Sequence, residues 1–71
     1  MDFKTLRLSV GMTQQDIADR LSISRTAVTM WEIGAAYPRA VILPTLASLL
    51  SVTEGDIIAA ISSTRKAKQA V

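Results

Sequence analysis

The side chains with the most specific chemistry lie in one short segment, Arg25 to Met30. The guanidinium group of Arg25 can donate two parallel hydrogen bonds to the O6 and N7 atoms of a guanine in the major groove of DNA. Threonine and methionine side chains can contact bases or the methyl group of thymine, although both are also ordinary on a helix surface. We therefore predict that one exposed helix face reads DNA bases, through Arg25, Thr26, Thr29 and Met30.

A glutamine at the start of a helix offers a second kind of chemistry. Thr13 and Asp16 have the spacing of a capping box, so a helix is predicted to begin at about Gln14. The N-terminus of a helix attracts anions, because its first N–H groups lack partners and the helix dipole is positive there. The Gln14 amide and these N–H groups are expected to contact a DNA phosphate; the alternative is a plain exposed glutamine.

Catalytic and metal-binding chemistry lacks its usual residues. The chain has no histidine and no cysteine, and its six acidic residues mostly fit capping or pairing positions. No acid and base pair, nucleophile or set of metal ligands can be assembled from what remains. We therefore expect no catalytic residue, no metal and no cofactor, and an enzyme is the weaker alternative.

Two short helices joined by a tight turn, between Thr13 and Gly34, are predicted to position the DNA-reading groups. Ala18 is expected where the helices cross, and Ser24 can cap the second helix. Trp31 could stack on the bases of single-stranded nucleic acid, but its helical spacing from Val28 favours a place in the core. The shared apolar face comprises Ile17, Ala18, Leu21, Ile23, Val28 and Trp31.

Further helices are predicted around this pair, which makes the fold an all-α bundle of five short helices. The first ends at Gly11, a residue suited to a left-handed C-terminal position. A proline-punctuated loop from Gly34 to Leu43 leads to a leucine-rich fourth helix, and a capping box of Thr53 and Asp56 opens the fifth. Residues 1–61 are expected to form one DNA-binding domain, and the basic residues 62–71 a flexible tail that adds either phosphate contacts or solubility.

The composition fits a small domain but does not by itself identify a partner. The chain has 71 residues, a net charge of +2 and a hydrophobic fraction of 49%. Its apolar runs are much shorter than the roughly 18 to 20 residues that span a bilayer. Asp2, Lys4 and Arg7 interrupt the stretch that a signal peptide would need. We expect a cytoplasmic protein with no membrane partner.

With these residues in view, the chain resembles the lambda-type repressor and Cro family of phage and bacterial helix-turn-helix regulators, over about Phe3 to Ile61. The resemblance rests on Thr13-Gln14, Ile17-Ala18 and Trp31-Glu32-x-Gly34, followed by a proline and a leucine-rich helix.

Roles for individual residues follow from the resemblance. It implies that Gln14 contacts phosphate and steadies the recognition helix, that the residues matching Arg25, Thr26 and Met30 approach bases, and that Arg39 touches the DNA backbone. It also implies a structural ion pair between Arg7 and Glu32. The predicted phosphate-contacting set is Gln14, Gln15, Ser24 and Arg39.

The chain also departs from the family pattern. Ser22 stands where the family usually has glycine, and a left-handed backbone there would cost on the order of 1 kcal/mol. The chain is short, like the Cro-type members, so dimerisation is expected to come from the domain itself. Ile57, Ile58 and Ile61 offer more apolar surface than one helix face needs, and we predict a twofold interface there, sealed by Ile58; the alternative is the monomer core.

Together these features predict a phage or prophage-type repressor that binds a palindromic, double-stranded operator as a homodimer, with half-sites about 34 Å apart. The alternative is an antitoxin or anti-repressor module, which would bind a partner protein through Val41 to Leu43 and Ile57 to Ile61. That module would lose its partner when Ile58 becomes charged, and Arg25→Ala would leave it unaffected.

Overall fold

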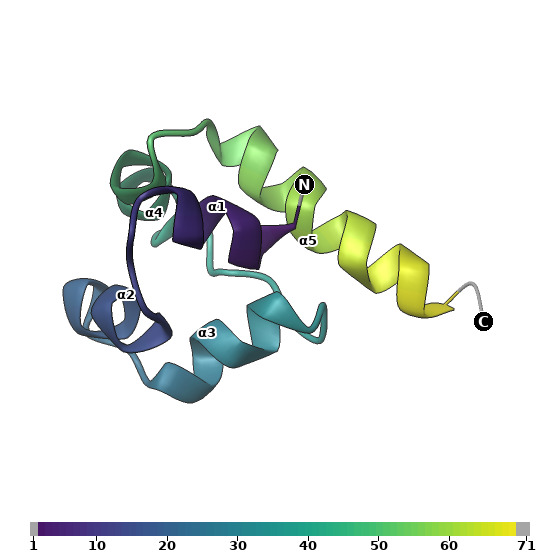
Figure 1. The fold of residues 1–71 in the computed structure, drawn as a ribbon, viewed down its shortest axis with the longest axis horizontal. Helices are drawn as coiled ribbons and strands as arrows, with labels where there is room; N and C mark the ends of the chain where they lie inside the picture. The colour runs from purple at the N-terminus through teal and green to yellow at the C-terminus, as the bar shows by residue number, and fades with distance from the viewer. Residues whose placement is uncertain (1, 70–71) are drawn as a thin grey trace.

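Five α-helices form the described part of the chain, which is residues 2–69 of a computed structural model. In Figure 1, α2 and α3 lie together on one side of the bundle, and the end of α5 extends beyond the other helices. The prediction of an all-α fold with five helices is confirmed. The helices are α1 (Phe3–Ser9), α2 (Gln14–Leu21), α3 (Arg25–Glu32), α4 (Leu43–Leu50) and α5 (Glu54–Gln69).

Two reciprocal capping boxes set the starts of α2 and α5. The Thr13 hydroxyl accepts from the Asp16 N–H at 3.0 Å, and the Asp16 carboxylate accepts from the Thr13 N–H at 2.8 Å. Thr53 and Asp56 make the same two bonds, both at 3.0 Å. The backbone N–H of each threonine, followed by its hydroxyl, lowers the pKa of the aspartate below its usual 3.8. The predicted start of α2 at Gln14 is confirmed.

The turn between α2 and α3 depends on a left-handed serine. Ser22 has φ 56° and ψ 45°, so it adopts the left-handed conformation in spite of its Cβ. Its conformation lets the Ile23 N–H return to the Ala18 carbonyl at 3.0 Å and satisfy one of the last carbonyls of α2. Ser24 then caps α3, accepting from the Ala27 N–H at 3.3 Å.

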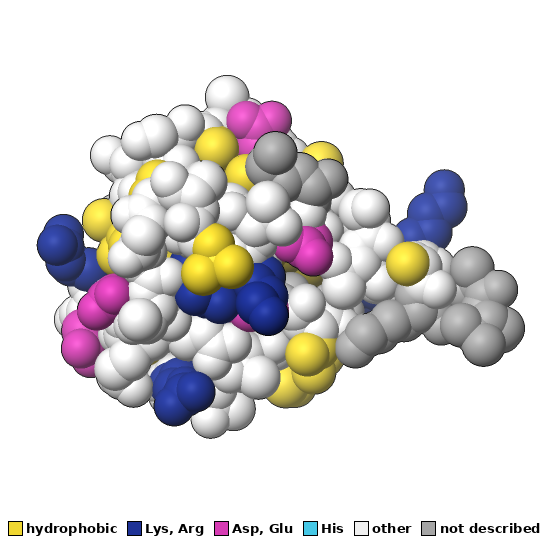
Figure 2. Space-filling view, viewed as in Figure 1, with side chains coloured by type: hydrophobic (Ala, Val, Ile, Leu, Met, Phe, Trp, Pro, Cys, Tyr) yellow, Lys and Arg dark blue, Asp and Glu magenta, His cyan; other side chains and the backbone are white. Residues whose placement is uncertain are grey.

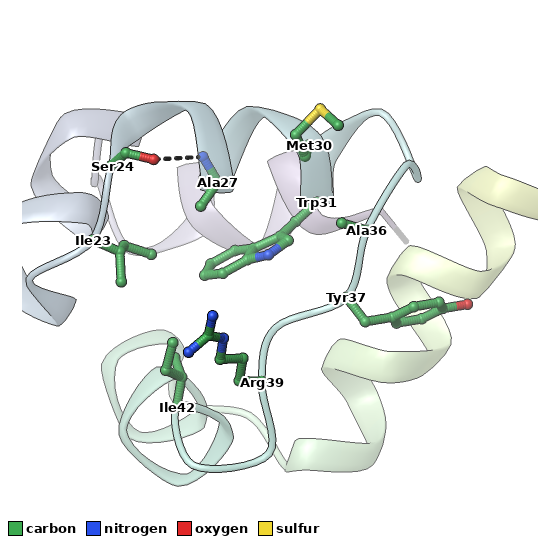
Figure 3. A pocket seen from close by; sticks show the side chains of 9 residues that line it. All are labelled: Ile23, Ser24, Ala27, Met30, Trp31, Ala36, Tyr37, Arg39 and Ile42. Carbon is green, nitrogen blue, oxygen red and sulfur yellow. Dashed lines mark hydrogen bonds between the residues drawn. The ribbon is translucent and has the colours of Figure 1, made fainter.

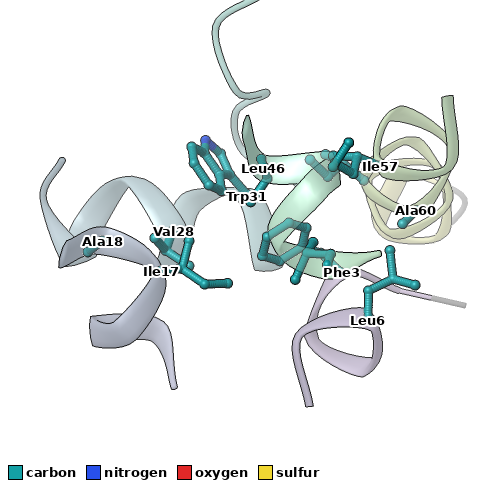
Figure 4. Packing of buried hydrophobic residues seen from close by; sticks show 12 residues of the cluster. Phe3, Leu6, Ile17, Ala18, Val28, Trp31, Leu46, Ile57 and Ala60 are labelled. Carbon is teal, nitrogen blue, oxygen red and sulfur yellow. The ribbon is translucent and has the colours of Figure 1, made fainter. Parts of the chain in front are cut away.

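The core is formed by side chains from all five helices (Figure 4). The rings of Phe3 and Trp31 pack edge to face, with centroids 5.7 Å apart and an interplanar angle of 77°. Trp31 is only 3% exposed, so it is a core residue and not a stacking platform. Ala18 is fully buried at the contact of α2 with α3, where its small size permits close approach.

The predicted subunit interface is wrong for two of its three residues. Ile57 and Ile61 are fully buried in the core of a single chain, so neither side chain can face a second subunit. Only Ile58 of the three reaches solvent, with 37% of its surface exposed. The apolar surplus read from the sequence is therefore mostly core.

The helix α5 also differs from expectation, because it continues to Gln69 where the sequence predicted a flexible tail from Ser62 onward. Contacts across the molecule support this continuation: Tyr37 bonds to Ser62, and the backbone of Arg65 lies directly on Gly34. The last two residues of the predicted tail lie outside the described residues. Within residues 2–69 no single helix has the length and hydropathy of a membrane span, although α4 and the 54–67 part of α5, bent by 90°, pass that test as a pair.

Candidate DNA-binding surface

The helix α3 presents three of the four predicted base-contacting side chains to solvent. Arg25, Thr26 and Met30 are exposed, Met30 by 38%. Thr29 is half-buried, and its hydroxyl lies 3.2 Å from two acceptors, the Gln14 side-chain oxygen and the Arg25 carbonyl. Thr29 therefore already has partners within the protein, and the exposed face of α3 is formed mainly by the other three.

Gln14, at the start of α2, is bonded to both ends of α3. Its side-chain oxygen accepts from the Arg25 Nε and the Thr29 hydroxyl, each at 3.2 Å. Its amide nitrogen donates to Glu32 Oε1 at 3.1 Å. Gln14 uses only the Nε of Arg25, so the N–H groups of the two terminal nitrogens can still donate to other acceptors. The steadying role that the resemblance implies for Gln14 thus has a direct geometric basis.

Behind Gln14 lies a buried ion pair between Arg7 and Glu32. The Arg7 Nε is 2.6 Å from Glu32 Oε2, and both side chains are only 8% exposed. The remaining Arg7 nitrogens donate to Glu32 Oε1 at 3.3 Å and to the Met12 carbonyl at 2.8 Å. This is the pairing that the resemblance implies, and its fork geometry ties α1 to the end of α3.

A hollow of about 550 Å³ opens where α1 meets the starts of α2 and α3, and it brings together cations from two helices. Lys4 and Arg25 both line it, next to Gln14 and Gln15. Lys4 is not among the DNA-contacting residues predicted from the sequence, in which it served only as a charge that interrupts a signal peptide. The available signal was spacing: Lys4 stands three residues before Arg7, which places both on one face of a helix.

The predicted phosphate-contacting residues at the helix starts have donors to offer. Gln15 is exposed, and its amide donates to Asp19 at 2.8 Å, which leaves one amide hydrogen for an external acceptor. Ser24 accepts a bond as the cap of α3, so its hydroxyl hydrogen remains available to donate. Both residues also lie at a helix start, beside backbone N–H groups that have no partner within the helix.

Arg39 lies apart from these residues, on the loop between α3 and α4. It lines a pocket of about 480 Å³, where its guanidinium points toward the indole ring of Trp31 (Figure 3). Met30, on the same pocket rim, directs its sulfur away from the pocket (Figure 3). Arg39 is exposed and close to α3, although the structure does not join it to the Gln14 network.

Charge does not gather into one dominant patch on the face that Figure 2 shows. Lys and Arg side chains are spread over several places, with acidic side chains between them (Figure 2). This distribution agrees with a net charge of only +2.

Comparisons with known proteins agree with this geometry. A family model described as helix-turn-helix matches residues 3–57. The chain is also 36% identical over 53 residues to an HTH-type transcriptional activator, BcrR, from Enterococcus faecalis. The match covers 75% of this chain and 26% of the relative, so the chain corresponds to about a quarter of that protein's length. No solved structure matches the chain.

Three observations agree on one assignment. The helices α2 and α3 are joined at a left-handed serine, the first residue of α2 holds Arg25 of α3, and the family match extends from α1 into the first turn of α5. The chain belongs to the lambda-repressor-type helix-turn-helix family of DNA-binding transcription regulators.

Proposed function

We propose that the protein reads double-stranded DNA by placing α3 in the major groove. Arg25 contacts a guanine, and Thr26 and Met30 contact neighbouring bases or thymine methyl groups. The observation that carries this proposal is the bond from the Arg25 Nε to Gln14, which is itself bonded to buried Glu32. An arginine held in this way loses less rotational freedom when it binds a base than a free surface arginine does.

Phosphate contacts flank α3 on both sides in this proposal. Gln14, Gln15 and Ser24 supply donors at the helix starts, and Lys4 adds a cation to the same hollow. Arg39 reaches the backbone from the loop on the other side of α3. Thr29 holds Gln14 in place and offers DNA only its methyl group.

We further propose that a homodimer occupies a palindromic operator, with half-sites about 34 Å apart, and represses transcription by covering a promoter. A twofold protein fits a twofold site because the same surface of each subunit meets the same half-site. Ile58 is the remaining candidate of the predicted interface, since its neighbours Ile57 and Ile61 are buried.

The test of this function is a selection of genome fragments by the purified protein at near-physiological salt, followed by sequencing of the retained DNA. We expect enrichment of one palindromic motif. A reporter gene placed behind that motif then gives the sign of regulation: repression on expression of the protein supports the proposal, and activation overturns that part of it.

Two arginine substitutions separate base reading from backbone contact. Arg25→Ala should cost about 1 to 3 kcal/mol of discrimination at one base pair, because the bidentate contact is lost. Arg39→Ala should weaken all sequences alike and reduce the salt slope of binding by about one unit, since it removes one phosphate contact. Titrations of operator and random DNA at several salt concentrations measure both effects. An equal loss on both DNAs for Arg25→Ala would show that α3 is not the reading element.

One observation supports the alternative function, a module that binds a partner protein. Val41 is 81% exposed, which is unusual for a valine beside a folded core. The rest of the proposed apolar face is less exposed than the sequence implied. Ile57 and Ile61 are buried, and Ile42 and Leu43 are partly buried. Absence of any enriched DNA motif in the selection would favour this alternative.

A further inference from the structure

Tyr37 attaches the middle of the loop between α3 and α4 to α5. The Tyr37 hydroxyl lies 2.8 Å from the Ser62 hydroxyl. The guanidinium of Arg65 sits over the tyrosine ring, 5.8 Å from its centroid, which is a cation–π contact. Figure 3 shows the Tyr37 ring directed toward α5, and Tyr37 also lines the pocket that holds Arg39.

The segment from Tyr37 to Arg39 is stiff. Buried Pro38 stands between the two residues. Its ring fixes its own φ near −65° and restricts the preceding residue to extended conformations. Arg39 is held from the other side as well, because its carbonyl accepts from the Ile42 N–H at 2.9 Å and the Leu43 N–H at 3.3 Å. A shift of Tyr37 therefore moves the base of the Arg39 side chain.

A second contact places the turn of α5 from Ser62 to Arg65 against Gly34, at the start of the loop. Gly34 has φ 77°, and a Cβ added there would lie 2.9 Å from the backbone nitrogen of Arg65. The Ser62–Arg65 turn thus touches the loop at both its beginning and its middle. Because Gly34 packs on backbone and not on a flexible side chain, the separation between α3 and this turn is closely defined.

We propose that Tyr37, Ser62 and Arg65 are positioning residues, which hold the loop so that Arg39 reaches a DNA phosphate. This inference rests on the proposed function for the role of Arg39. It gives the C-terminal half of α5, which was expected to be a loose tail, a defined task in DNA binding. A direct phosphate contact by Arg65 is the competing explanation for any effect of that residue, and the test separates the two.

The test is a double-substitution cycle on binding to the selected operator. Arg65→Ala should weaken binding about two- to five-fold, the factor that an exposed cation–π contact corresponds to. Arg65→Lys keeps the cation and should restore affinity. Lys66→Ala is the matched control, because it removes the same charge from the next, exposed residue. In a chain that already carries Arg39→Ala, Arg65→Ala should have no further effect. Equal losses in both backgrounds, or an equal loss for Lys66→Ala, would overturn the inference.

A readout without DNA keeps the inference independent of the proposed function. Arg39 points toward the indole ring of Trp31, so the NMR signal of the indole N–H reports its position (Figure 3). Tyr37→Phe and Arg65→Ala should shift that signal in the direction seen for Arg39→Ala, and Lys66→Ala should leave it unchanged. If the selection finds no operator but the signal shifts, the positioning role stands and the function fails. If an operator is found but the signal is unchanged, the positioning role fails alone.

Discussion

At the scale of single residues, the proposed DNA-binding surface is supported by an ion pair buried beneath it. The chain of contacts runs from Arg7 through Glu32 to Gln14 and then to Arg25 on the surface. A buried ion pair contributes little net stability when both partners are present, because removing two charges from water offsets their attraction. The pair is better explained by what it orients. Glu32 holds the Gln14 amide, and Gln14 in turn directs Arg25.

Breaking that pair should be costly for stability. Glu32→Ala leaves Arg7 buried without its counter-charge, and we expect a loss of about 3 to 5 kcal/mol in the free energy of unfolding. Urea unfolding followed by circular dichroism measures the loss. Arg20→Ala, which removes an exposed charge from α2, is the control and should change stability by less than about 0.5 kcal/mol. A similarly small loss for Glu32→Ala would mean that water solvates the Arg7 charge and that the ion pair contributes little to stability.

At the scale of helices, two of the five end in left-handed serines. Ser22 ends α2 with φ 56°, and Ser51 ends α4 with φ 57°. In each, the Cβ crowds the backbone in a conformation that glycine adopts freely. The sharp turns that follow α2 and α4 therefore carry local strain that packing must offset.

Replacing either serine with glycine should stabilise the protein. We expect Ser22→Gly to raise the free energy of unfolding by roughly 0.5 to 1 kcal/mol, as the relief of strain exceeds the greater freedom of glycine in the unfolded chain. Ser48→Gly is a matched control on the exposed side of α4, and should lower stability by about 0.5 kcal/mol because its backbone is helical. Thermal unfolding of the three proteins measures both. A lower melting temperature for Ser22→Gly would contradict the strain argument.

The two capping boxes predict how helix stability depends on pH. The pKa values of Asp16 and Asp56 are lowered by hydrogen bonds from their threonines, so the folded protein binds these protons more weakly than the unfolded chain. Their contribution to stability is complete above 3.8, the usual pKa, and is lost as the pH falls through the lowered folded pKa. Thermal unfolding in acid should therefore be less pH-dependent for Asp56→Asn than for the parent, and Asp19→Asn, which caps no helix, should follow the parent. An unchanged acid profile for Asp56→Asn would exclude the box as the cause.

The elements also show which features a sequence can predict. Helix starts at Thr13, Ser24 and Thr53 were predictable, because a cap depends on residues within one turn. Burial of Ile57 and Ile61 was not, since it depends on where α5 lies against α1, α3 and α4. The helical state beyond Ser62 was missed for the same reason: Gly34 and Tyr37, which support it, stand about thirty residues earlier in the chain. The proposed task of Arg65 has no local pattern either, because its partner Tyr37 lies on a distant loop.

At the scale of the whole molecule, the small size limits what one copy can recognise. The described chain extends 34 × 23 × 22 Å, and its only 16-residue helix is α5. One recognition helix reads only a few base pairs, so a unique genomic site requires two copies or a further domain. The modest net charge of +2 also favours two copies or a further domain, because a small net charge adds little nonspecific attraction to DNA.

The proposed dimer can be tested at its one exposed isoleucine. Ile58→Asp should leave the fold intact, since 37% of the side chain is exposed, and should reduce binding to the full palindrome while leaving half-site binding unchanged. Analytical ultracentrifugation and titrations on both DNAs measure this. Val41→Asp, at the 81% exposed valine, is the comparison variant. Loss of the dimer in Val41→Asp alone would move the interface to the loop before α4.

Gly34, which follows α3, is the position at which a substitution should make the protein sensitive to temperature. Any side chain at position 34 must adopt the left-handed backbone and push the α5 backbone away, since its Cβ would stand 2.9 Å from Arg65 N and 3.0 Å from Arg65 Cα. The displaced turn is the one that carries the loop of Arg39. In a domain of marginal stability such a change is tolerated in the cold and becomes decisive with warming. Gly34→Ala is thus the substitution from which a temperature-sensitive regulator would arise.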